Sequence, residues 1–106
     1  AMAYSFSISD SNAAIIASVH CAISAADSIC IYFLGVRHSG ESHSDAVALL
    51  ASVPVAGKEN ACRQLSRLLG LKSSAEYGER LFTPKDASEA MRDAERVIAF
   101  AKAHVR

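Results

Sequence analysis

Nine residues from Gly35 to His43 gather side chains that can act on a phosphodiester. A guanidinium such as that of Arg37 neutralises phosphate charge, and an imidazole such as that of His43 moves protons near neutral pH. This is the pair of groups that a metal-independent ribonuclease needs, and His38 and Glu41 are further candidate binding residues in the segment. The same residues also fit a polar turn in which Arg37 covers one helix C-terminus and His43 opens the next helix. The sequence leaves both interpretations open.

A second group of cations follows in the next helical pattern. Arg63, Arg67 and Lys72 form an RNA-docking surface if they share one basic face, and only Arg63 and Arg67 have the i, i+4 spacing of helical neighbours. A solvated helix face is the alternative. The chain has eleven basic and eleven acidic residues, so its formal net charge is zero. Neutrality argues against a general nucleic-acid coat but leaves room for one local phosphate site.

Two polar residues interrupt the most apolar part of the chain. His20 and Asp27 are seven positions apart and share one face of a predicted helix. We expect them to be buried, with Asp27 hydrogen-bonded to Lys72 or Tyr77, because an unpaired buried carboxylate is costly. The alternative is a buried polar seam, including Tyr77, at a ligand site or a dimer interface.

The remaining residues suggest no metal or cofactor chemistry. The three cysteines, at positions 21, 30 and 62, and the histidines at positions 20, 38 and 43 have no metal-ligand spacing. No phosphate-binding glycine loop is present. Since an odd number of unpaired thiols is typical of a reducing compartment, we expect a cytoplasmic protein.

Composition and periodicity predict one all-α domain over residues 1–106, with residues 1–11 an N-terminal extension that begins with a cloning remnant, Ala1. About half the residues are hydrophobic, alanine is abundant and tryptophan is absent, which favours closely packed helices in a compact antiparallel four-helix bundle. The first helix is expected to start after Asp10, Ser11 or Asn12 and to stop at Gly35. Further helices are predicted at about 44–53, from Lys58 to about Gly78, and from Pro84 after a Thr83 cap.

The segment from Ala13 to Leu34 is nearly long enough and apolar enough to span a bilayer. However, it contains Asp27 and His20, and no basic cluster flanks it. We therefore expect a core helix of a soluble bundle and no association with a membrane. Ile15, Val19, Ala22, Ala26, Ile29 and Phe33 are its predicted core stripe.

In this organisation the chain resembles the HEPN superfamily of small four- or five-helix domains. The resemblance rests on the order of several local features, which together cover most of residues 12–103. They are Ala-Ile-Ser-Ala-Ala-Asp at 22–27, Leu-Gly-Val-Arg at 34–37, Ser42-His43 before a helix ending Ala-Leu-Leu, Leu-Leu-Gly-Leu-Lys at 68–72, Ala-Glu-Tyr-Gly at 75–78 and Thr-Pro-Lys-Asp-Ala at 83–87.

The resemblance implies RNA chemistry or an adaptor role derived from it. Active HEPN domains are metal-independent endoribonucleases of toxin–antitoxin and defence systems, and they usually act as dimers. By this resemblance Arg37 would bind the scissile phosphate and His43 would act on the 2′-hydroxyl or the leaving oxygen. In active members, however, the pair generally lies together on a late helix, whereas here it flanks Gly40 after the first helix. We therefore expect a non-catalytic homodimeric module associated with RNA, a nucleotide, an antitoxin or a nucleotidyltransferase-type partner, and we keep the endoribonuclease as the alternative.

Overall fold

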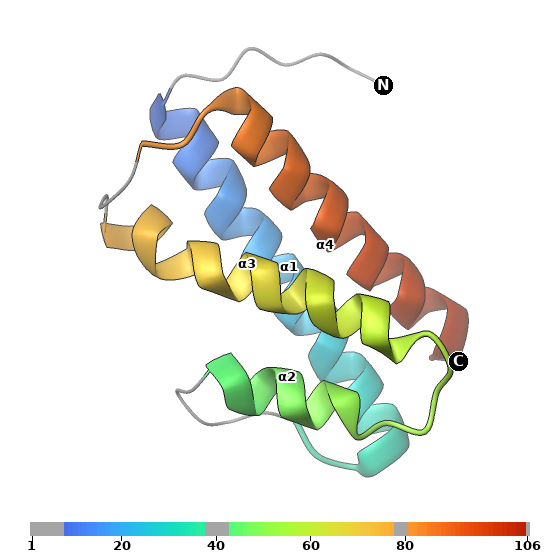
Figure 1. Cartoon of the computed structure of the whole chain (residues 1–106). Helices are drawn as coiled ribbons and strands as arrows, with labels where there is room; N and C mark the ends of the chain where they lie inside the picture. The colour runs from blue at the N-terminus through green and yellow to red at the C-terminus, as the bar shows by residue number, and fades with distance from the viewer. Residues whose placement is uncertain (1–7, 38–42, 78–80, 106) are drawn as a thin grey trace.

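The computed structural model describes residues 8–37, 43–77 and 81–105. Over these ranges the chain folds into four helices, α1 (Ile8–Leu34), α2 (His43–Ala51), α3 (Lys58–Tyr77) and α4 (Pro84–His104) (Figure 1). The predicted all-α class is confirmed. The predicted starts of the second, third and fourth helices agree with the structure to within one residue.

The first helix starts earlier than its polar residues predicted. It begins by Ile8, so part of the expected N-terminal extension belongs to α1. Ser11 is fully buried, and the side-chain amide of Asn12 donates a hydrogen bond of 3.5 Å to the carbonyl oxygen of Ala75 in α3. These residues resemble helix caps in sequence, but packing against α3 draws them into the body of the helix.

The three long helices form the body of the domain, and α2 packs across α1 and α3. Figure 1 shows α1 and α4 side by side and running in the same direction, with α3 running against both. The bond from Asn12 to Ala75 fits this direction of α3, because it joins the start of α1 to the end of α3. The arrangement therefore differs from a uniformly antiparallel bundle. The short α2 and its connections return the chain, so that α3 can run back along α1.

Buried alanines let α1, α3 and α4 approach closely. Five of the six residues predicted as the core stripe of α1 are buried, and Phe33 is half-buried. In α2, Leu50 is buried, Val47 is half-buried and Ala51 is exposed. Small side chains supply much of the remaining core, including Ala22, Ala26, Ala61, Ala75, Ala87, Ala90, Ala94 and Ala101.

The connection into α4 contains the clearest local signal of the chain. Thr83 has the extended backbone of an N-cap, and its hydroxyl oxygen accepts a hydrogen bond of 3.2 Å from the backbone N–H of Asp86. The Asp86 carboxylate accepts a bond of 2.9 Å from the backbone N–H of Thr83. This reciprocal pair is the predicted capping box, and Pro84 stands at the first helical position as expected. Just before it, Phe82 is buried while Leu81 is exposed.

By length and composition, the Asp10–Leu34 part of α1 is able to cross a membrane. In this fold it packs against α2, α3 and α4. The core helix of a soluble protein satisfies the same criteria of length and composition.

Candidate functional site

The segment that carries the predicted ribonuclease pair begins where α1 ends. Gly35 takes a positive φ of 74°, and its N–H donates a hydrogen bond of 2.9 Å to the carbonyl oxygen of Ile31, as in a glycine-terminated helix. Arg37 is exposed just beyond this turn. His43 is the first residue of α2. Its side chain, together with His38 and Glu41, lies outside the described residues. The described part of the segment therefore fits the interpretation as a polar turn between two helices.

The cations predicted to form an RNA-docking surface do not share one face. Arg63 and Lys72 are nine positions apart, which places them on opposite sides of α3. Arg63 is exposed and donates a hydrogen bond to the side-chain oxygen of Asn60. Lys72 is half-buried. One basic stripe along α3 is therefore absent among the described side chains.

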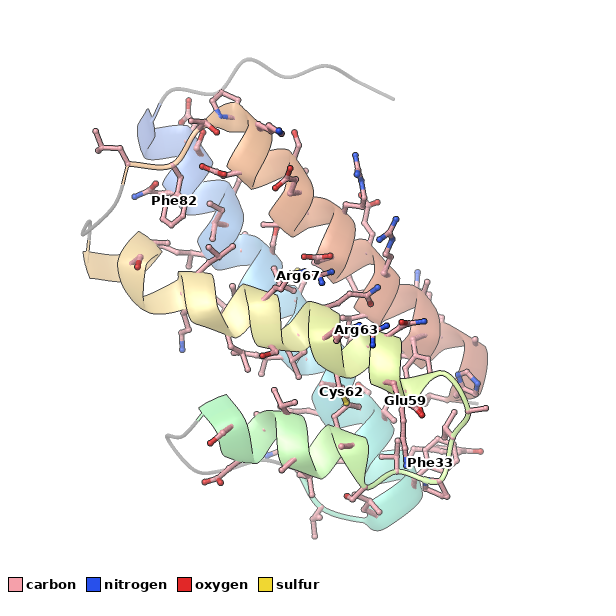
Figure 2. The ribbon with its side chains drawn as sticks, viewed as in Figure 1. Phe33, Glu59, Cys62, Arg63, Arg67 and Phe82 are labelled. Atoms are coloured by element: carbon pink, nitrogen blue, oxygen red, sulfur yellow. The ribbon has the colours of Figure 1, made fainter. Side chains whose placement is uncertain are left out.

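Arg67 is held by a carboxylate from another helix. Its Nη2 lies 2.8 Å from Asp93 Oδ1, and its Nε lies 3.1 Å from Asp93 Oδ2, so the guanidinium and the carboxylate form a bidentate pair. The hydrogen bond with Asp93 raises the pKa of the Arg67 guanidinium above its usual value. Figure 2 shows Arg67 on α3, beside α4. The Asp93 carboxylate therefore links α4 to α3.

The pair lies in an open groove of about 590 Å³ between α3 and α4. Three guanidinium groups and three carboxylates line it, so its charges balance. A nucleic-acid surface requires an excess of positive charge, which this groove does not supply. Its charged lining residues are Arg67, Arg92, Arg96, Asp86, Glu89 and Asp93.

The predicted buried polar seam in α1 is not formed as expected. His20 is exposed, which contradicts the predicted burial, and it lines a shallow groove together with Ile98 of α4. Asp27 is half-buried. The end of α3 lies beside Asn12, about 22 Å along α1 from Asp27, so the proposed bond to Lys72 or Tyr77 does not fit the course of α3. The side chain of Tyr77 lies outside the described residues.

The three thiols have different surroundings. Cys21 is exposed, Cys30 is buried and Cys62 is half-buried. Burial, and then the negative charge of Asp27 and the neighbouring Cys62, raises the pKa of the Cys30 thiol from 9.0 to about 11. Burial also raises the pKa of Cys62. Among the described residues, no group of three or more His, Cys, Asp or Glu side chains is placed to hold a metal ion.

A second groove, which the sequence interpretation missed, runs between α1 and α4. We call it the α1–α4 groove. One part, of about 250 Å³, is almost entirely apolar, and a second part of about 420 Å³ adjoins it at Cys21 and Ile98. The signal was present in the sequence, since small residues recur every three or four positions on the exposed side of α1. The lining of the apolar part is Ala14, Ala17, Ser18, Cys21, Met91, Ala94, Glu95 and Ile98.

Comparison with protein-family models, with curated proteins and with solved structures gives no significant match.

Proposed function

We propose that this chain is a non-catalytic helical module that acts by binding another protein, as an HEPN-like adaptor in a toxin–antitoxin or defence system. The observation that carries the proposal is the α1–α4 groove, an uncovered and mainly apolar depression between two long helices. Apolar grooves between helices are suited to binding a helix of a partner. The resemblance to HEPN domains suggests two kinds of protein partner, a second copy of the chain and a nucleotidyltransferase-type antitoxin.

The charges of the described residues favour a protein partner over RNA. Binding to a phosphate backbone gains most of its free energy from cations that release counterions. Arg67 is neutralised by Asp93, and Arg92 and Arg96 share their groove with Asp86 and Glu89. Binding of RNA at the groove between α3 and α4 would have to break the ion pair between Arg67 and Asp93.

The test is the behaviour of purified protein toward labelled RNA in EDTA. Single-stranded and hairpin RNAs are expected to remain intact, and wild type and Arg37→Ala are expected to behave alike. Arg92→Ala is the matched control, since Arg92 is also exposed but lies on α4. Cleavage in EDTA that leaves cyclic-phosphate ends, and that is lost in Arg37→Ala and His43→Ala but kept in Arg92→Ala, would overturn the proposal.

An endoribonuclease that uses Arg37 and His43 is the second candidate function. The exposure of Arg37 favours it, because a guanidinium must be accessible to bind a scissile phosphate. This candidate predicts that expression of the wild-type chain slows bacterial growth and that Arg37→Ala relieves the effect. Equal growth of cells that express either form would contradict the endoribonuclease.

A further inference from the structure

The surface formed by α1 and α4 has a hollow at one end and protruding side chains at the other. We propose that this surface binds a second copy of the chain in antiparallel orientation, so that Tyr32 of each copy enters the α1–α4 groove of the other. The inference rests on the proposed function as an interaction module and names the first partner of that module. It is carried by the shape, the size and the charges of the surface.

The hollow end lies in the first half of α1. Ala17 and Cys21 are exposed on α1, and Met91 and Ile98 are half-buried on the adjacent side of α4. Side chains as small as alanine and cysteine leave space above the helix that a larger side chain can fill. The apolar lining favours an aromatic or aliphatic group over a charged one.

The protruding end lies in the last turns of α1. Tyr32 and Ile31 are about half exposed, although each is large and apolar. Tyr32 follows Cys21 by eleven positions, close to three full helical turns, so both lie on the same side of α1. The Tyr32 ring also packs edge-to-face on Phe33, with ring centroids 4.9 Å apart, and this contact limits its freedom in the monomer.

A two-fold axis that crosses α1 at right angles between Ser24 and Ala25 brings the protruding end of one copy against the hollow end of the other. Rotation about this axis reverses α1 and exchanges positions that are equally distant from it. Tyr32 of one copy then lies opposite Ala17 of the other, and Ser28 lies opposite Cys21. Each contact occurs twice, as in the isologous interfaces of most homodimers.

The charged residues at the edge of the surface are compatible with this rotation. Glu95 and Lys102 are exposed and seven positions apart on one side of α4. The rotation reverses α4 as well, so the Glu95 carboxylate of one copy approaches the Lys102 ammonium of the second copy. Two such pairs form per dimer. In a parallel arrangement of the same helices like charges would lie closer together.

The area available is sufficient for a weak but specific dimer. The stretch of α1 from Ala13 to Tyr32 is about 28 Å long, and two helices packed side by side are about 18 Å wide. The surface then covers roughly 500 Å² on each copy, or roughly 1,000 Å² in total. This is close to the lower limit of specific protein–protein interfaces, at about 1,000 Å².

Disulfide cross-linking tests the inference in the full-length chain. Ser28→Cys places a new thiol opposite the native Cys21 of the second copy. Within one chain these positions are about 10 Å apart along the helix, beyond the limit of about 7 Å between Cα atoms that a disulfide can join. A disulfide between Cys21 and the new thiol must therefore join two chains. Mild oxidation of Ser28→Cys at about 100 µM is expected to give a covalent dimer that reducing agent separates.

Two control proteins distinguish cross-linking within the antiparallel dimer from cross-linking by random collision. Wild type and the double variant Cys21→Ser, Ser28→Cys are each expected to remain uncross-linked, since each lacks one of the two facing thiols. Cross-linking of wild type through Cys21 would indicate a parallel dimer and overturn the inference. So would the absence of cross-linking in Ser28→Cys. Either result leaves the proposed function standing if RNA stays intact in EDTA, whereas cleavage lost in Arg37→Ala and His43→Ala would overturn that function whatever the oligomeric state.

Discussion

The guanidinium of Arg67 in α3 is bonded through two nitrogens to the carboxylate of Asp93 in α4, at 2.8 and 3.1 Å. The pair joins two helices and removes a free cation from the surface at which RNA binding had been predicted. Since the Arg67 side chain is more than half exposed, water and salt screen the pair.

Asp93→Asn is expected to lower the free energy of unfolding by about 0.5–1 kcal/mol, because a well-aligned but exposed pair contributes little. Urea unfolding at low salt and at about 1 M salt measures it, and the loss should shrink at high salt. Glu89→Gln, at an exposed position in the same groove, is the control and should change stability less. A loss of several kcal/mol that salt does not reduce would contradict a screened pair.

Phe82→Ala is expected to lower the free energy of unfolding by about 3–5 kcal/mol, because it empties a fully buried site where the connection meets the helices. Leu81→Ala is the neighbouring control. Leu81 is 71% exposed, so its truncation should change stability by less than about 0.5 kcal/mol. Thermal unfolding followed by circular dichroism compares the two, and equal losses would show that the burial of this connection is wrongly assigned.

Thr83→Ala is expected to lower the free energy of unfolding by about 1 kcal/mol, because it leaves the first turn of α4 without its side-chain hydrogen-bond acceptor. Asp86→Ala removes the reciprocal bond, and the double variant should lose less than the sum of the single variants, since both act on one capping box. Ser88→Ala, at an exposed position of the same helix, should be close to neutral. Chemical denaturation of wild type and these four variants gives the values, and full additivity would argue against a shared cap.

The buried thiol of Cys30 predicts a stability change at alkaline pH. Its pKa is raised from 9.0 to about 11, so the folded chain retains a proton that the unfolded chain loses. The stabilisation is therefore complete below pH 9 and is lost as pH rises through 11, by at most about 2.7 kcal/mol. Urea unfolding at pH 8 and pH 10.5 should show a smaller decrease in Cys30→Ala than in wild type. Cys21→Ala, at an exposed thiol, should keep the wild-type decrease, and equal decreases in all three proteins would contradict this assignment.

Local signals of the sequence predicted the helices well, because each depends on residues close together in the chain. The Thr83 cap with Pro84 fixes the start of α4, and the apolar repeat of Ile15, Val19 and Ala22 fixes the inner face of α1. The start of α1 was predicted too late, since the burial of Ser11 depends on packing with other helices.

The candidate site was harder to predict because it depends on which helices become neighbours. Arg67 and Asp93 are 26 positions apart in the chain, and only the packing of α3 against α4 brings them together. The exposure of His20 and the α1–α4 groove likewise follow from α4 lying parallel to α1, an arrangement that periodicity alone does not specify.

The most direct test of the account is the molar mass of the protein in solution, measured by light scattering at about 100 µM for wild type, Ala17→Arg and Ala48→Arg. Both alanines are exposed on helices, but Ala17 lines the α1–α4 groove and Ala48 lies on α2. We expect a dimer for wild type and Ala48→Arg and a folded monomer for Ala17→Arg, because a guanidinium fills the hollow that receives Tyr32. A monomeric wild type, or a dimer that Ala17→Arg leaves unchanged, would contradict binding through this surface.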